Sequence, residues 1–313
     1  SSDLVDGFLS LNKPVGWTSH DCVAKLRRLL KIKKIGHAGT LDPAATGVLP
    51  IAVGRATRLI QYLPGGKVYR AVIRFGLTTS TDDLEGDPLT EISAEQLSLE
   101  TIQAQIPNFI GTLNQIPPRY SAIQVQGQRL YDLARRGETV EVPLRQVQID
   151  QFKILNWHPG RAAELTAAIA CGSGTYIRSI ARDLGQAVGT GGTLANLVRT
   201  CSSGFELSES LTLEGIAARL EAGALALISP AIACGHLPQL TLESDQVKGW
   251  LNGQKLAVFN GAGPVLPLNQ PLRVASADYG FLGIAELRLA EPESEAAKTP
   301  VRVAVPKLVF HPR

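Results

Sequence analysis

The chain has 313 residues, which is long for a single hydrophobic core, and its 44% hydrophobic and 19% charged residues are typical of a globular protein. No apolar run reaches the roughly 18 residues that span a bilayer. The acidic N-terminal residues with no apolar run after them predict no signal peptide, so we expect a cytoplasmic protein. The net charge of +3 hides an asymmetry, because residues 1–75 carry twelve Lys and Arg against four Asp, which favours a polyanionic partner.

The first predicted helix begins at Ser19, which can cap it, and buries one apolar side made of Val23, Leu26, Leu29 and Leu30. Six cations lie on or just after this helix with no acid among them: Lys25, Arg27, Arg28, Lys31, Lys33 and Lys34. A solvated helix face is an equally good explanation of a cationic run that stands alone. The uniform sign of this one favours contacts with the phosphates of a nucleic acid.

Residues 36–50 surround a single carboxylate, Asp42, with three glycines, two prolines and several apolar residues. Glycine and proline disfavour a long helix or strand, so this segment is predicted to be a loop, and its apolar residues predict that it packs against a core. An Asp before Pro is a common turn starter, and that role stays open for Asp42. The polar neighbours His37 and Thr40 favour a functional site instead.

The alternation of residues 69–75 predicts a strand, and Ser93 is expected to begin a helix that reaches about Ile106. Residues 117–145 start with two prolines, contain several arginines and predict an exposed basic excursion. Two strands at 146–157 and 164–171 are then expected, followed by helices at 176–188 and 211–220.

A new pattern begins near residue 238 and predicts a second domain. A short helix is expected from Asp245 to Leu251, followed by alternating segments at 273–277, 281–289 and 301–310. Short strands at regular spacing, separated by Gly and Asn turns, are typical of a small β-barrel. We therefore predict domains at 1–237 and 238–313.

Four cysteines lie thirty or more positions apart, without a Cys-x-x-Cys pair, so neither a zinc site nor a disulfide framework is predicted. The Gly172-Ser173-Gly174 turn before a predicted helix could cradle a phosphate. It lacks the Lys-Ser/Thr of a nucleoside triphosphate loop. We expect no metal and no cofactor.

The segment at 36–50, GHAGTLDPAATGVLP, fills every fixed position of the pattern G-H-x-G-x-L-D-P-x-A-x-G-x-L-P. Further stretches follow the order of one family: GFLSLNKPVGWTS at 7–19, KVYR at 67–70, PPRYSA at 117–122, GTYIRS at 174–179 and LVRT at 197–200. With them the chain closely resembles the TruB-type tRNA pseudouridine synthases over roughly residues 7–215. VKGWLNGQ at 247–254 and FLGIA at 281–285 are similar, more weakly, to the PUA-like RNA-binding module of many of these enzymes.

The resemblance implies an α+β pseudouridine synthase fold, with a mixed, largely antiparallel central sheet flanked by helices and loops, and a C-terminal PUA-like β-barrel. It implies an isomerase that converts uridine 55 in the T-arm loop of tRNA to pseudouridine. Such an enzyme flips the base out, breaks the bond between N1 and the ribose, turns the base and rejoins it through C5. This chemistry needs no metal, redox cofactor or ATP. The oligomeric state is not readable from the sequence, and a monomer is the default expectation.

The resemblance assigns catalysis to Asp42 as nucleophile, to Arg178 as its ion-pair partner and to Tyr69, which stacks on the target base. An exposed aspartate is already ionised at neutral pH, so Arg178 is expected to orient Asp42 and to offset its desolvation. Substrate binding falls to His37, Tyr176, Leu197 and Lys13. The phosphate contacts are predicted at Lys25, Arg28, Lys31, Lys33, Lys34 and Arg129. Packing roles in the core remain the alternatives for Tyr69, His37 and Leu197.

Two departures from the family pattern are expected to change affinity rather than chemistry. Gln124 stands where the family usually has a lysine, and Val198 replaces an arginine. Two other functions stay open: a catalytically silent RNA-binding or tRNA-folding protein on the same scaffold, and a nucleotide enzyme built on the loop at Gly172. The first has no need of an intact Asp42, Tyr69 and Arg178, and the second predicts affinity for free nucleotides.

Overall fold

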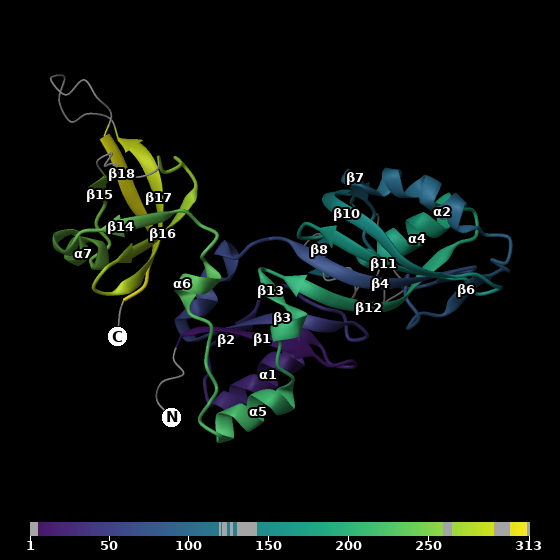
Figure 1. The fold of residues 1–313 in the computed structure, drawn as a ribbon, viewed down its shortest axis with the longest axis horizontal. Helices are drawn as coiled ribbons and strands as arrows, with labels where there is room; N and C mark the ends of the chain where they lie inside the picture. Colours follow the sequence, from purple (N-terminus) through teal and green to yellow (C-terminus); the bar gives the residue numbers. More distant parts are fainter. Residues whose placement is uncertain are drawn as a thin grey trace.

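The computed structural model describes residues 6–118, 120, 143–258, 265–290 and 301–311, together with the backbone at 124–125 and 128–129. The described residues form two domains, each built on a sheet of its own (Figure 1). The larger sheet with its helices occupies the right and centre of the view, and the smaller sheet with α7 (Ser244–Leu251) lies at the left end.

The sheet of the first domain has nine strands among the described residues. Its spatial order is β1 (Gly7–Lys13), β3 (Thr46–Val53), β12 (Gly192–Ser202), β4 (Lys67–Phe75), β11 (Glu164–Cys171), β10 (Arg145–His158) and β7 (Gly111–Gln115). The short strands β2 (Ile35–His37) and β13 (Phe205–Glu206) pair with β3 and β12. β12 runs parallel to β3 and the other pairings in this sheet are antiparallel. The predicted mixed, largely antiparallel sheet is thus confirmed.

Two groups of helices cover this sheet and each has its own core. α1 (Ser19–Leu30) and α5 (Leu213–Glu221) pack together against β1, with Leu11, Leu26 and Leu49 fully buried between them. Each leucine buried in this way contributes about 1.5–3 kcal/mol to folding. α4 (Ile177–Ala187) and α2 (Leu99–Gln105) lie over β4, β11 and β12 above a second core. The helix α4 thereby carries its N-terminus to the middle of the sheet.

Shorter elements connect these layers. They are the 3-10 helices η1 (Gly54–Tyr62), η2 (Ile106–Phe109) and η3 (Leu207–Glu209), the helix α6 (Pro230–Ala233), the strand pair β5 (Leu77–Thr79) and β6 (Pro88–Glu91), and the strand pair β8 (Gln124–Val125) and β9 (Gln128–Arg129). The loop between β5 and β6 docks on β12, where Leu194 N–H donates to the Asp82 carbonyl at 3.0 Å. This loop borders the site described below.

The second domain is a five-stranded half-barrel sheet with α7 packed on it, which agrees with the predicted small β-barrel module. Its spatial order is β14 (Gln239–Leu242), β16 (Pro271–Ser276), β17 (Gly280–Ala290), β18 (Val301–Val309) and β15 (Leu256–Val258). Trp250 of α7 is fully buried and its indole N–H donates to the Leu282 carbonyl at 2.8 Å. An apolar cluster that includes Phe8, Ile284 and Phe310 joins the two domains.

α1 begins at Ser19, as predicted, but its predicted cap is wrong by one residue, and the predicted start of α2 is wrong by six residues. α1 is capped by Thr18, whose hydroxyl accepts the Asp21 N–H while the Asp21 carboxylate accepts the Thr18 N–H. This reciprocal capping box leaves Ser19 inside the helix, buried against the Leu41 backbone. α2 begins at Leu99 with Ser98 as its cap, so the segment 93–97 is not helical.

The prediction of a loop over the whole of residues 36–50 is also wrong at both ends. β2 extends to His37 and β3 begins at Thr46, so the loop itself covers residues 38–45. Pro50 lies inside β3, where its carbonyl accepts the Ala38 N–H at 2.9 Å. Gly47 has φ +103°, and a Cβ there would lie 2.2 Å from the carbonyl oxygen of Arg199. Gly47 therefore marks a close approach of β3 to its parallel neighbour β12, and Pro50 lies within a paired strand, so neither residue marks the end of regular structure.

Candidate active site

A cavity of about 680 Å³ lies where the loop 38–45, the strand β4, the β5–β6 loop and the N-terminus of α4 meet. Five of the residues predicted from sequence line it: Asp42, Tyr69, Tyr176, Arg178 and Leu197. These side chains come from four segments that are far apart in the chain. Lining residues of the described part that the sequence analysis did not single out include Lys67, Thr81, Asp83, Glu85 and Tyr120.

The loop that carries Asp42 is fixed from three sides. Leu41 is buried in the core beneath α4 and its N–H donates to the Ser19 hydroxyl at 2.9 Å. The Pro43 carbonyl accepts the Gly16 N–H at 2.8 Å and the Lys13 ammonium at 3.2 Å. The Asp42 side chain is left 42% exposed at the cavity wall. The backbone around the carboxylate is therefore held while the carboxylate remains accessible.

Arg199, on β12, holds the two ends of the same loop and was missed by the sequence analysis. The side chain is fully buried. Its Nε donates to the Val48 carbonyl at 2.7 Å, and its two terminal nitrogens donate to the Gly39 and Thr40 carbonyls at 3.0 and 3.3 Å. The guanidinium thus spans from β3 to the start of the loop, which a single ammonium could not do. The sequence signal for this role is that Arg199 belongs to the LVRT motif at 197–200.

Arg178 lies in the first turn of α4 and is 6% exposed. Its Nη2 is 3.0 Å from Oδ2 of Asp42 and its Nη1 is 3.6 Å from Oδ2 of Asp83. The same nitrogens donate to the Tyr120 carbonyl at 3.1 Å and the Thr81 carbonyl at 3.2 Å. The guanidinium is therefore shared by two carboxylates and fixed by two backbone carbonyls.

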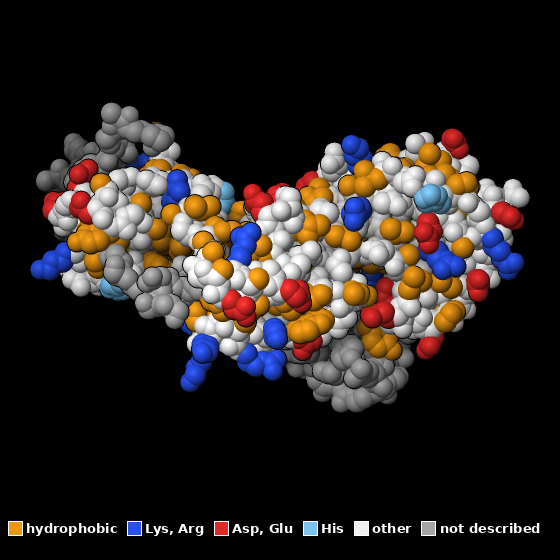
Figure 2. All heavy atoms as spheres, turned by 60° about the horizontal axis from the view of Figure 1, so that its bottom comes forward, with side chains coloured by type: hydrophobic (Ala, Val, Ile, Leu, Met, Phe, Trp, Pro, Cys, Tyr) orange, Lys and Arg blue, Asp and Glu red, His pale blue; other side chains and the backbone are white. Residues whose placement is uncertain are grey.

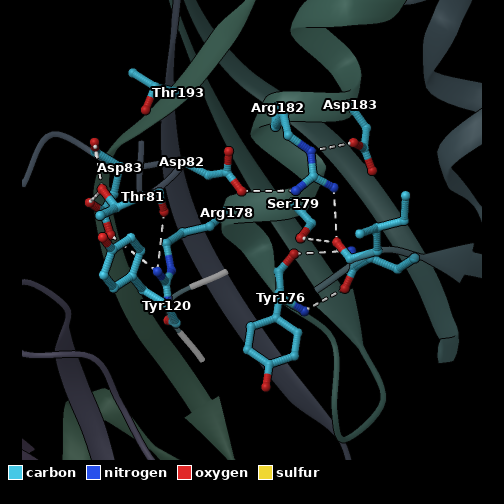
Figure 3. Close-up of polar contacts among 12 residues, drawn as sticks. Thr81, Asp82, Asp83, Tyr120, Tyr176, Arg178, Ser179, Arg182, Asp183 and Thr193 are labelled. Carbon is cyan, nitrogen blue, oxygen red and sulfur yellow. Dashed lines mark hydrogen bonds and ion pairs between the residues drawn. The ribbon is translucent and has the colours of Figure 1, made fainter. Parts of the chain in front are cut away.

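The β5–β6 loop contributes the second carboxylate. Thr81 hydroxyl donates to Oδ1 of Asp83 at 2.5 Å, and the Glu85 N–H donates to the same oxygen at 3.1 Å. Figure 3 shows this loop facing α4, with Asp83 near Arg178 and Asp82 directed at Arg182. Asp82 has φ +62°, a left-handed conformation that Asp tolerates better than most residues.

Tyr69 forms part of the cavity wall from β4 and is 6% exposed. It is paired across the sheet with Arg199. Burial raises the pKa of the Tyr69 phenol, and the Arg199 guanidinium opposes that change. The phenol is consequently protonated at neutral pH, with a cation close enough to stabilise its ionised form.

Two further predicted residues border the cavity and are half-buried. Tyr176 precedes α4, and its backbone N–H and C=O are bonded to the Gln115 side chain at 2.9 and 3.1 Å. Leu197 lies on β12 opposite Ala71 and supplies an apolar wall. Lys67, at the start of β4, adds a cation whose pKa is lowered by burial and by Arg199. The cavity thus combines an aromatic side, an apolar side and charged groups.

Lys13 is not placed for the substrate contact expected of it. The side chain is fully buried and its ammonium donates to the carbonyls of Trp17, Pro14 and Pro43 at 2.6, 2.9 and 3.2 Å. Burial lowers the pKa of Lys13. The residue ties the opening segment to the Asp42 loop and acts on the site through the backbone.

His37, at the end of β2, is half-buried and does not belong to the described lining of the cavity. Its ring meets that of His20 edge-on, with the centroids 5.4 Å apart. Burial, and next the neighbouring His20, lower the pKa of His37. The imidazole is therefore neutral at pH 7, close to the loop but outside the pocket.

The five cations predicted on and after α1 are all exposed: Lys25, Arg28, Lys31, Lys33 and Lys34. Arg27 instead bonds the Ile35 carbonyl at 2.8 Å. Figure 2, turned so that the bottom of Figure 1 comes forward, shows Lys and Arg side chains along its lower margin and acidic side chains nearer the centre. The side chain of Arg129, the residue Gln124 and most of the excursion expected at 117–145 lie outside the residues whose side chains are described.

The part of the chain that the structure describes offers no candidate for a metal site or for a membrane-spanning helix. No cluster of three or more His, Cys, Asp or Glu side chains there could hold a metal ion. No helix there is both long and apolar enough to cross a bilayer.

Known protein families match both parts of this chain. Residues 27–177 match the model of the TruB family pseudouridylate synthase N-terminal domain, and residues 238–291 match the C-terminal model of pseudouridine synthase II TruB. A protein of Gloeothece citriformis named tRNA pseudouridine synthase B is 52% identical over 304 residues, which is 97% of each chain. One of Trichormus variabilis with the same name is 51% identical over 98% of this chain and 99% of its own.

Solved structures show the same fold. A Cbf5-Nop10-Gar1 complex contains a chain that is 25% identical, with a TM-score of 0.73 over 98% of this chain and 85% of that one. An H/ACA RNP bound to a substrate RNA containing 2′-deoxyuridine gives a TM-score of 0.72, at 25% identity over 98% and 86% of the two chains. The near full-length likeness to the curated relatives confirms the resemblance and the isomerase class predicted from the motifs: the chain belongs to the TruB family of pseudouridylate synthases.

Proposed function

We propose that this protein converts uridine 55 in the T-arm loop of tRNA to pseudouridine, with Asp42 as the nucleophile. The observation that carries the proposal is the ion pair of 3.0 Å between Asp42 and a buried Arg178, at the wall of a cavity that Tyr69 and Leu197 also line. The names of the curated relatives support tRNA as the substrate. A protein that only binds RNA has no use for this arrangement.

The size and lining of the cavity suit a single flipped nucleotide. Its volume of about 680 Å³ lies within the range of pockets that hold small ligands. Extraction of a base from its stack costs a few kcal/mol, which an aromatic face and new hydrogen bonds can offset. Tyr69 supplies the face and Leu197 the apolar wall, while Lys67 and Glu85 add charged groups to the lining.

Asp42 is accessible in the free protein, and entry of the base would change that. The carboxylate is 42% exposed and its partner Arg178 is almost wholly buried. A base seated in the cavity displaces water from this pair. The interaction between the guanidinium and the carboxylate is then stronger, because water no longer screens it. Arg178 then keeps Asp42 ionised and oriented while the bond between N1 and the ribose breaks and the bond from C5 forms.

The protonation state of the buried Tyr69 phenol determines whether Tyr69 can remove the proton from C5. Because burial keeps its pKa above the ordinary value, Tyr69 carries its own proton at neutral pH. In its resting form the phenol can therefore donate a hydrogen bond but cannot accept a proton as a phenolate. Removal of the C5 proton by Tyr69 requires phenolate, and the neighbouring Arg199 is the cation that would stabilise it.

The test is to incubate the full chain with a transcript of a whole tRNA and map pseudouridine at every position. Product at position 55 and nowhere else supports the proposal. A second transcript with cytidine at position 55 is the control for specificity. Product at another uridine would support a pseudouridine synthase but contradict position 55 as its target. Tight binding without product would favour the catalytically silent RNA-binding alternative.

A further inference from the structure

The helix α4 presents two arginines to the same loop. Arg178 and Arg182 are four positions apart and so lie on one face, one turn from each other. Figure 3 shows both guanidinium groups directed at the β5–β6 loop, with Asp83 near the first and Asp82 near the second. Arg178 thus lines the cavity, and Arg182, one turn further along the helix, does not.

Every nitrogen of the Arg182 guanidinium is used. Its Nη1 pairs with Oδ2 of Asp82 at 2.9 Å, and its Nε pairs with Oδ1 of Asp183 at 2.8 Å. Its Nη2 donates to the Ile116 carbonyl at 2.9 Å. The Arg182 side chain is 26% exposed and that of Asp82 is 15% exposed, so water screens this pair only in part.

Four carboxylates and two guanidinium groups meet here, so their pairing is a matter of competition. Arg178 holds Asp42 and Asp83, while Arg182 holds Asp82 and Asp183. Burial raises the pKa of Asp82; Arg182 opposes this most and Arg178 less. Asp82 therefore lies within the field of Arg178 as well as that of Arg182, with which it forms its ion pair.

We propose that Arg182 is a positioning residue that divides the charge of this cluster. By neutralising Asp82 and Asp183, it leaves the guanidinium of Arg178 to Asp42 and Asp83. Without Arg182, the partly buried Asp82 turns to Arg178, and the hold of Arg178 on Asp42 weakens. The inference rests on the proposed role of Asp42 as nucleophile.

A simpler role for Arg182 is to tie the β5–β6 loop and the Ile116 segment to α4. The two roles differ in what happens when Asp82 is removed as well. For a tether, the bond to Asp82 is already lost in Arg182→Gln, so removal of Asp82 restores nothing and the double variant is as impaired as Arg182→Gln. Charge division predicts rescue, because the competing carboxylate has gone.

Asp82→Gly is the suitable second substitution. Glycine adopts the left-handed backbone at φ +62° without strain, so the loop keeps its path while the carboxylate is removed. We therefore compare Arg182→Gln, Asp82→Gly and the double variant with the wild type, by single-turnover pseudouridine formation on a tRNA transcript, by tRNA affinity and by thermal unfolding. Arg288→Gln removes a surface ion pair with Glu286 in the second domain and serves as the matched control.

Arg182→Gln is expected to lower the single-turnover rate by about 10- to 100-fold, the range in which misplaced catalytic groups act. The affinity for tRNA should stay near that of the wild type, and the double variant should recover most of the rate. A double variant no faster than Arg182→Gln overturns the proposal, as does an Arg182→Gln variant with a normal rate. If Arg182→Gln unfolds at the assay temperature, Arg182→Lys replaces it: the retained charge predicts a rate near the wild type, and a rate as low as that of an Arg178 variant contradicts charge division.

Failure of the proposed function can be distinguished from failure of charge division by Arg182. If the wild type forms no pseudouridine, or Asp42→Asn forms it normally, the role of Asp42 falls and the inference with it. If both behave as proposed, the comparison of Arg182→Gln with the double variant judges charge division alone.

Discussion

Arg178 and Asp42 form an ion pair of 3.0 Å in which one partner is almost hidden and the other open, with side-chain exposures of 7% and 42%. The guanidinium is fixed by the carbonyls of Thr81 and Tyr120, so its position does not depend on Asp42. The site is therefore built around an anchored cation, and the carboxylate is the part that meets the substrate.

Arg178→Lys should retain tRNA binding and lose about 100-fold in single-turnover rate, because a misplacement of about 1 Å is enough for such a loss. One ammonium cannot reach two carboxylates and two carbonyls that a planar guanidinium reaches together. Rapid-quench measurement of pseudouridine with saturating enzyme gives the rate. Arg288→Lys is the control, and a near-normal rate for Arg178→Lys would remove the orienting role.

Gly47→Ala should destabilise the protein far more than a change of backbone preference explains. A left-handed conformation costs an alanine about 1–2 kcal/mol, and at Gly47 the added Cβ would also meet the Arg199 carbonyl oxygen at 2.2 Å. Gly189→Ala is the matched control, since Gly189 has φ +78° and no atom within 4 Å of a Cβ. Urea unfolding of both variants separates the two costs, and equal losses would contradict a close approach of Gly47 to the Arg199 backbone.

Stability should fall as the pH drops through the range below about 6.5, and His37 should account for part of the fall. Its pKa is lowered in the folded protein, so between that pKa and the ordinary value of 6.5 the unfolded chain binds more protons than the folded one. Protonation then favours unfolding, and above about pH 7 the effect vanishes. His37→Gln should flatten the curve of unfolding free energy against pH from 5 to 7. The exposed His158→Gln is the control, and an unchanged curve for His37→Gln would refute the assignment.

The cations that follow α1 should contribute to tRNA binding through phosphates. Replacing Lys31 and Lys33 with Gln should reduce the slope of log affinity against log salt by about 0.7–0.9 for each phosphate that the variant no longer neutralises. Lys153→Gln with Arg161→Gln removes two exposed cations elsewhere in the first domain and controls for net charge. Equal slopes for the two double variants would mean that these cations form a solvent-exposed helix face and do not contact the phosphates of tRNA.

Elements with a strong local pattern could be predicted from the sequence. The strand at 69–75 is observed as 67–75, and the pair at 146–157 and 164–171 as 145–158 and 164–171. In these segments burial alternates along the chain, so the alternation of apolar and polar residues in the sequence predicts a strand. The ends of β2 and β3 could not be predicted, because Gly47 and Pro50 are placed by contacts with β12 and with Ala38.

The candidate site could be predicted only where a residue belongs to an ordered motif. Asp42, Tyr69, Tyr176, Arg178 and Leu197 do, and the structure brings them to one cavity. Lys13 also does, but three backbone carbonyls enclose its ammonium, which no motif reveals. Arg182 and Arg199 act through partners distant in the chain, so their roles depend on the fold.

The most direct test of the central claim compares Asp42→Asn with the wild type on a uridine-containing T-arm stem-loop, in single-turnover experiments with equal binding of the RNA verified first. Asparagine keeps the shape of the side chain and removes its nucleophilic oxygen anion, and Asp150→Asn on the exposed side of β10 is the matched control. We predict pseudouridine with the wild type and Asp150→Asn, and none with Asp42→Asn. Equal product from Asp42→Asn would contradict the account.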